Sequence, residues 1–182
     1  IASQIQFSAE NEDLFRAVQE GNTEKLEGLR DLIRSDPDAE LSGSHQRLDM
    51  VSFVNSDGRT FFRAGNPRAS GDDMLWDSVV RRCIETRIPQ ASTELMPIEK
   101  ILLENPALSE RANVDIVETP RSIELKEKRL REGMVMRAAY PIKDKHGKLL
   151  AILTGGVLLC RDNGIVDNGR AQVSHGEKYN GQ

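Results

Sequence analysis

The 182-residue sequence has little cysteine, little histidine and few aromatic residues. Aromatic residues make up 4%, too few for a platform on which nucleic-acid bases would stack. Its 25 basic residues against 29 acidic ones give a net charge of -4, so it also lacks the concentrated basic face of a nucleic-acid-binding domain. We therefore expect no nucleic-acid partner.

The sequence also lacks a long apolar run. The longest one, residues 149–159, is about half of the roughly 20 residues that a membrane-spanning helix needs, and Thr154 lies within it. A hydrophobic fraction of 38% beside 30% charged residues is typical of a globular chain with one sizeable core. The chain starts without methionine, and we expect it to be a piece of a longer protein whose membrane anchor lies outside these residues.

Cysteine and histidine chemistry is poorly supported. Cys83 and Cys160 lie in no CxxC motif, which argues against a zinc ribbon, a thioredoxin-like site or c-type haem. They are either two reduced, buried thiols or the halves of a disulfide. His45, His146 and His175 have no partner at metal-ligand spacing. The sequence therefore predicts no metal site and no cofactor.

No catalytic motif is present either. The sequence contains no nucleophile elbow, phosphate-binding loop, dinucleotide fingerprint or HExxH motif. The acidic pair Asp72-Asp73 precedes a predicted helix, where carboxylates cap the N-terminus. Paired-carboxylate catalysis would need a second acidic site that the sequence does not indicate. We predict no catalytic residues and no enzymatic activity in this domain.

Two segments with a period of two predict antiparallel hairpins. Residues 49–64 turn at Asp57-Gly58, where glycine accepts the positive φ of a tight turn. Residues 133–160 turn at His146-Gly147, and their mostly apolar strands indicate a central position in the sheet.

Helical spacing occurs in three other segments. Residues 1–35 predict two helices, and apolar residues three and four apart predict further helices over 73–86 and within 96–106. Residues 112–118 are a candidate edge strand. Helices and hairpins in this order predict an α+β domain with an antiparallel sheet and helices on one side.

Two arginines are the strongest candidates for ligand contact. Arg63 ends the second strand of the first hairpin, and Arg137 lies inside an otherwise apolar strand. Burying a guanidinium without a partner is costly. Arg137 therefore either pairs with an internal carboxylate or awaits an anionic ligand, which the fork of the guanidinium suits.

Three motifs follow one another along the chain. They are DGxxxxRxxNP at 57–67, GDD at 71–73 and GMxxxAAxPIxDxxGxLxAxLxGGxLL at 133–159. In this order the sequence resembles the extracytoplasmic Cache sensor domains of bacterial transmembrane receptors. The similarity extends over most of the chain, from about Ser8 to Asp167.

The resemblance implies a PAS-like Cache fold, in which a long N-terminal helix packs beside a central five-stranded antiparallel sheet. A small molecule would bind on the sheet, most simply a small organic acid. Arg63 and Arg137 match positions at which related sensors often hold their ligands, and Phe61 and Met136 are neighbours that would line the pocket.

The resemblance also implies an organisation. Residues 1–35 would form the membrane-proximal and dimer helix, 36–167 the sensor domain, and 168–182 a tail leading to the next module or to a transmembrane helix. The domain would lie in the periplasm, as part of a dimeric histidine kinase or chemoreceptor. The alternative is a protein-interaction module without a small-molecule ligand.

Overall fold

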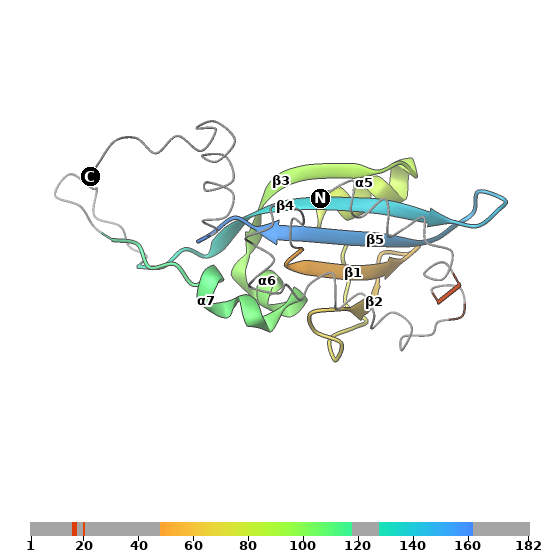
Figure 1. Cartoon of the computed structure of the whole chain (residues 1–182). Helices are drawn as coiled ribbons and strands as arrows, with labels where there is room; N and C mark the ends of the chain where they lie inside the picture. The colour runs from red at the N-terminus through yellow and green to blue at the C-terminus, as the bar shows by residue number, and fades with distance from the viewer. Residues whose placement is uncertain (1–15, 18–19, 21–47, 118–127, 162–182) are drawn as a thin grey trace, which may run out of the picture.

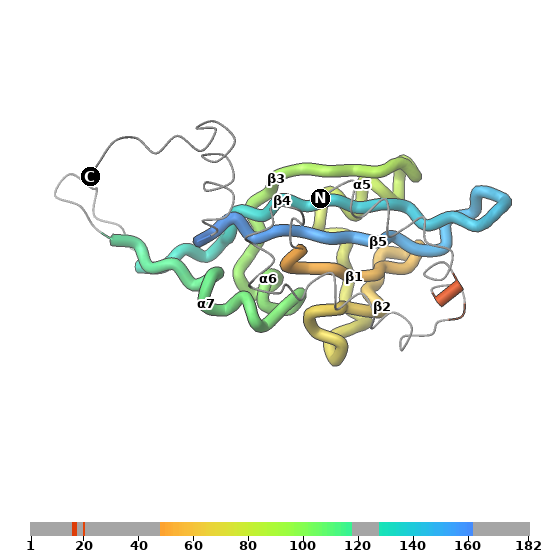
Figure 2. The backbone as a smooth tube through the Cα atoms, viewed as in Figure 1, coloured from red at the N-terminus to blue at the C-terminus, as the bar shows by residue number. Residues whose placement is uncertain are grey.

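The structure, a computed structural model, describes residues 16–17, 20, 48–117 and 128–161 (Figures 1 and 2). Residues 16–17 and 20 are helical. The rest of the two helices predicted over 1–35 and the tail at 168–182 lie outside the described residues, as does the dimer prediction that depends on them.

A five-stranded antiparallel sheet forms the centre of the domain. Its strands are β1 (Met50–Asn55), β2 (Thr60–Arg63), β3 (Gln90–Pro97), β4 (Glu132–Lys143) and β5 (Leu149–Leu158). The order across the sheet is β2-β1-β5-β4-β3, which places β5 between β1 and β4, at the centre of the sheet (Figure 1). The sequence-based prediction of an α+β domain built on an antiparallel sheet is confirmed.

Both predicted hairpins are present and belong to this sheet. Gly58 has φ of +89° and Gly147 has φ of +80°, the left-handed conformation that favours glycine. In each turn the glycine N–H donates to a carbonyl three residues earlier, Asn55 at 3.1 Å and Asp144 at 2.9 Å. The two turns therefore form where the sequence predicted them.

The first hairpin contains a bulge that decides where its side chains point. Phe53 is opposite Phe62, but Val54 is opposite Thr60, so Phe61 is an extra residue in β2. In a regular strand, residues three apart lie on opposite faces. The bulge places Thr60 and Arg63 on the same face.

The helices occur at two places in the chain. α5 (Ser78–Thr86) lies between β2 and β3. α6 (Ile98–Glu104) follows β3 and is itself followed by the short helices η3 (Pro106–Leu108) and α7 (Ser109–Ala112). The helix predicted within 96–106 is confirmed as α6. None of the described helices is both long and apolar enough to cross a membrane.

The predicted start of the 73–86 helix was wrong. α5 begins at Ser78, and its N-cap is Asp77, whose side chain accepts hydrogen bonds from the N–H groups of Val79 and Val80. Asp72 and Asp73 do not cap it. Asp73 instead accepts a hydrogen bond from the N–H of Leu75 at 2.7 Å, a local turn that competes with helix.

Both faces of the sheet carry apolar side chains. We call the face under α5 and α6 the helix face, and the other the opposite face. The helix face holds one cluster under each helix, whereas the opposite face holds a third cluster that includes the helical residue Ala17. Under α5 the strands contribute Val54, Ala139 and Ile152, and under α6 they contribute Met50, Val135 and Leu158. On the opposite face they contribute Val51, Phe53, Phe62, Ala138 and Leu153.

Two parts of the sheet differ from the prediction. β3 was not predicted, and the candidate edge strand at 112–118 is reduced, within its described residues, to a single bridge between Asp115 and Arg129. β3 pairs with β4 over all eight of its residues and is the outer strand on that side.

Candidate functional site

Arg63 and Arg137 lie on the same face of the sheet. Residues directly opposite one another in neighbouring strands share a face, as do residues two apart along a strand. Arg63 is opposite Ser52, which is opposite Thr154. Two residues along β5, Gly156 is opposite Arg137. The two arginines therefore belong to adjacent rows of the helix face.

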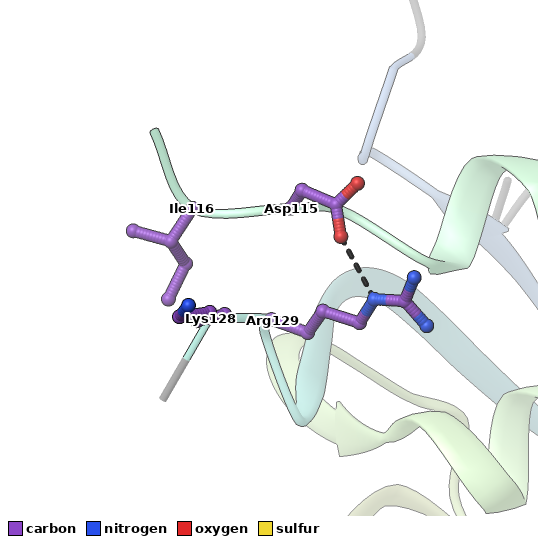
Figure 3. Close-up of a pocket in the computed structure, with 4 residues that line it drawn as sticks. All are labelled: Asp115, Ile116, Lys128 and Arg129. Atoms are coloured by element: carbon purple, nitrogen blue, oxygen red, sulfur yellow. Dashed lines mark hydrogen bonds and ion pairs between the residues drawn. The ribbon is translucent and has the colours of Figure 1, made fainter. Parts of the chain in front are cut away.

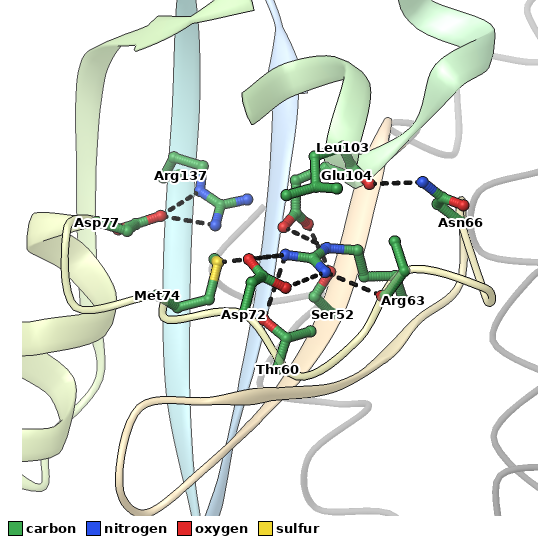
Figure 4. Close-up of polar contacts among 11 residues, drawn as sticks. Ser52, Thr60, Arg63, Asn66, Asp72, Met74, Asp77, Leu103, Glu104 and Arg137 are labelled. Atoms are coloured by element: carbon green, nitrogen blue, oxygen red, sulfur yellow. Dashed lines mark hydrogen bonds and ion pairs between the residues drawn. The ribbon is translucent and has the colours of Figure 1, made fainter. Parts of the chain in front are cut away.

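Arg63 is completely buried and uses each of its nitrogens (Figure 4). Its Nη1 and Nη2 donate to the two oxygens of Asp72 at 2.6 and 2.8 Å. Nη1 also donates to the carbonyl of Ala69, and Nη2 to the hydroxyl of Thr60 at 3.2 Å. Nε donates to Oε1 of Glu104 at 2.9 Å. Two internal carboxylates therefore pair with Arg63.

Glu104 is the buried carboxylate of this cluster, with a side chain only 1% exposed. Its Oε2 accepts a hydrogen bond from the hydroxyl of Ser52 at 2.5 Å. Asp72, at 29%, is the member nearest to solvent. Both oxygens of Glu104 are therefore paired, which is the condition under which a buried charge is tolerated.

Arg137 pairs with a different carboxylate. Its Nε and Nη2 both donate to Oδ2 of Asp77, at 3.0 and 2.7 Å, and both side chains are 2% exposed. The other oxygen of Asp77 caps α5 by accepting from Val79 and Val80, at 2.9 and 3.1 Å. One aspartate therefore joins the start of α5 to the middle of β4.

The third nitrogen of Arg137 has no partner among the residues that the structure describes. Nη1 is buried and makes no hydrogen bond to any of them. Gly156 lets the side chain lie flat across β5, because a Cβ there would come within 2.9 Å of Cδ of Arg137. An unmet buried donor costs about 1–3 kcal/mol, and more when it is charged. Within the described part of the chain, the helix face thus carries one charged nitrogen without an acceptor.

The electrostatics favour the charged forms of the arginines. Burial by itself lowers the pKa of Arg63, but the hydrogen bond to Asp72 and the charge of Glu104 outweigh it and raise that pKa. Burial likewise lowers the pKa of Arg137, and the charges of Asp77 and Glu104 reverse the effect. The hydrogen bond from Arg63 lowers the pKa of Asp72, against a smaller opposing effect of burial.

Phe61 and Met136 lie apart from the two arginines. Met136 is next to Arg137 in β4 and so points to the opposite face, where both it and Phe61 pack, half-buried, against the cluster that contains Phe53. The ring centres of Phe61 and Phe53 are 5.7 Å apart. The structure therefore brings Arg63 and Arg137 to one face, and Phe61 and Met136 to the other.

Three polar residues of the site were missed by the sequence reasoning. Asp77 directly precedes the apolar periodicity of α5, which is an N-cap signal that would have found it. Glu104 lies three residues after the buried Ile101, and this spacing places it on the same side of α6. Ser52 offers no signal beyond its alternation with Val51 and Phe53.

An open depression lies elsewhere, beside the Asp115–Arg129 bridge (Figure 3). It is lined by Asp115, Ile116, Lys128 and Arg129. Nε of Arg129 donates to Asp115 at 2.8 Å, and these two side chains are 71% and 67% exposed. An exposed ion pair of this kind contributes little to stability or recognition.

The cysteines have no bond to each other. Cys83 is buried on the side of α5 that packs on the sheet, Cys160 is partly exposed, and both thiols are free. Burial raises the pKa of Cys83 to about 12. Among the residues that the structure describes, there is no group of three or more His, Cys, Asp or Glu side chains arranged to hold a metal ion.

Comparison of the sequence with models of known protein families and with curated proteins finds no match.

Proposed function

We propose that this chain is the extracytoplasmic sensor domain of a bacterial transmembrane receptor, a histidine kinase or a chemoreceptor. In this proposal the fold is PAS-like, of the Cache type, with the sensor domain at 36–167 and the flanking segments leading toward the membrane. The receptor is a homodimer, and the domain lies in the periplasm. The domain performs no catalysis; it binds a small molecule and transmits a conformational change.

Two features support the proposal. The five-stranded antiparallel sheet with α5 and α6 on its helix face agrees with the architecture that the motif resemblance implies. The observation that carries the ligand-binding function is Arg137, a buried guanidinium on the helix face whose Nη1 amino group meets no acceptor among the described residues. Buried polar groups of this kind are normally paired, and a bound molecule would supply the missing acceptor.

The alternative is an interaction module whose sheet is covered by its own side chains. It is favoured by Arg63, which is saturated by internal partners, and by Met74, which is 0% exposed and fills space beside it. In this case the fold would be the same, but no small molecule would bind on the helix face.

A thermal-shift screen separates the two proposals. Organic acids, amino acids, amines and neutral amides are tested on the wild type and on the variant Asp77→Asn/Arg137→Met. This double change removes both members of the buried pair, which proteins tolerate better than the loss of one. A ligand at a hundredfold excess over Kd stabilises the wild type by about 2.7 kcal/mol, a clear shift in Tm.

The sensor proposal requires at least one compound that raises the Tm of the wild type and not that of the variant. If no compound raises Tm, or if the variant responds equally, the interaction module is the better account.

A further inference from the structure

The unpaired donor of Arg137 points to an identifiable place. Nε and Nη2 are directed at Asp77, and Nη1 points the other way, toward the side on which Glu104 and Arg63 lie (Figure 4). Nη1 is completely covered, so an acceptor reaches it only if a neighbouring group moves.

The neighbour best able to move is Met74. Its side chain is 0% exposed, and its sulfur lies 3.5 Å from Nη2 of Arg63, on the side that faces Arg137 (Figure 4). Methionine is unbranched and flexible, and it readily changes rotamer. Its loop is joined to α6 by a contact between Lys100 and the ring of the partly exposed Trp76, at 5.3 Å. A change in the rotamer of Met74 would therefore make room beside Arg63, on the side that faces Arg137.

The charges around this space oppose an anion. Two buried arginines face three carboxylates that are paired with them: Arg63 and Arg137 against Asp72, Asp77 and Glu104. Two positive charges and three negative charges leave the cluster at -1. A carboxylate placed against Nη1 would add a second uncompensated negative charge in a site with little water, where such charges are costly. A neutral oxygen accepts the same hydrogen bond without that cost.

We propose that Arg137 binds an uncharged hydrogen-bond acceptor, the oxygen of a carboxamide, ketone or hydroxyl group on a small polar molecule that displaces Met74. The proposal rests on the ligand-binding function proposed above and names the chemistry of its central contact. It replaces the organic acid that the sequence alone led us to expect at this position.

Acetamide and acetate test the inference, because they have the same shape and differ by one charge. Their binding is followed by NMR through the guanidinium N–H signals of Arg137, assigned by their loss in Arg137→Lys. Titrations are run at equal ionic strength. For the wild type we expect acetamide to shift these signals saturably, and acetate to bind at least about tenfold more weakly.

Glu104→Gln is the matched charge variant. Glutamine keeps an oxygen for Nε of Arg63 and offers its amide to the hydroxyl of Ser52, so the Arg137–Asp77 pair and the N-cap of α5 stay intact while the cluster changes from -1 to 0. We expect acetate to gain at least about tenfold relative to acetamide in this variant. Met74→Ala opens the space directly, and we expect it to bind acetamide more tightly than the wild type does.

The possible results have separate meanings. Preference for acetate in the wild type would overturn the neutral-acceptor inference but leave the sensor function in place. An absence of shifts in both the wild type and Met74→Ala would also overturn it, because the donor would then have no accessible acceptor site. The sensor function itself is judged by the thermal-shift screen, whose hits are independent of these two probes.

Discussion

Arg63 offers a direct test of how the buried cluster contributes to stability. Arg63→Met replaces the apolar stem of the side chain but removes the guanidinium, so that Glu104 stays buried without a cation and Asp72 loses its fork of hydrogen bonds. Removing one partner of a buried ion pair costs about 3–5 kcal/mol, since the remaining charge is uncompensated. Glu104, at 1% exposure, has no access to water that would reduce this cost.

Glu104→Gln is the milder change. Glutamine retains an oxygen or an amide for Ser52, and Arg63 keeps its bidentate pair with Asp72, so the loss is that of one charge-assisted hydrogen bond, about 2 kcal/mol. When both changes are combined, the glutamine no longer faces a buried cation and the methionine no longer faces a buried anion. The double variant should therefore lose less than the sum of the single losses, by about 1–3 kcal/mol.

Urea unfolding at pH 7 measures all four proteins. The m-value should remain constant, so that midpoint shifts report changes in the free energy of unfolding. Additive losses, within about 0.5 kcal/mol, would refute the idea that Arg63 and Glu104 stabilise the fold as a pair.

Two further predictions follow from the pKa shifts. Because burial raises the pKa of Cys83 to about 12, iodoacetamide at pH 8 should alkylate at most Cys160 in the native protein. In urea it should alkylate both thiols, and mass spectrometry would show the difference. Rapid labelling of Cys83 in the native protein would contradict its burial. The hydrogen bond from Arg63 lowers the pKa of Asp72 in the folded protein. The ionised carboxylate therefore stabilises the fold fully above its unfolded pKa of about 3.9, and this stabilisation is lost as the pH falls through the lower pKa of the folded state. Asp72→Asn should therefore be less stable than the wild type at pH 7, and urea unfolding should show that difference shrinking in acid; a difference independent of pH would argue against the ion pair.

The hairpins were predictable because their signals are local. A period of two and a glycine at the turn are each read within one continuous segment, 49–64 or 133–160, and tertiary packing does not override them. β3 lacks such a signal. It is an outer strand whose side chains are largely exposed, so its sequence alternates weakly, and its pairing with β4 depends on backbone hydrogen bonds that any residue makes.

The candidate site was predictable in part. Arg137 stands out because an arginine in an apolar strand needs a partner, but that partner, Asp77, lies 60 residues earlier and reaches it only when α5 packs on β4. The separation of Met136 from Arg137, by contrast, follows from alternation along a strand. Phe61 is harder to place, because its orientation depends on a bulge that is defined by the register between β1 and β2.

The central position of β5 has a consequence for synthesis. β5 is the last strand of the sheet in the chain, yet it lies between β1 and β4 at the centre of the sheet. Asp49, just before β1, accepts a hydrogen bond from the N–H of Leu158, 109 residues later. While the chain emerges from the ribosome, the inner edges of β1 and β4 remain open until β5 arrives. Such apolar, unpaired edges are prone to intermolecular pairing. A nascent chain of this domain therefore depends on protection of these edges until about ten more residues complete the sheet.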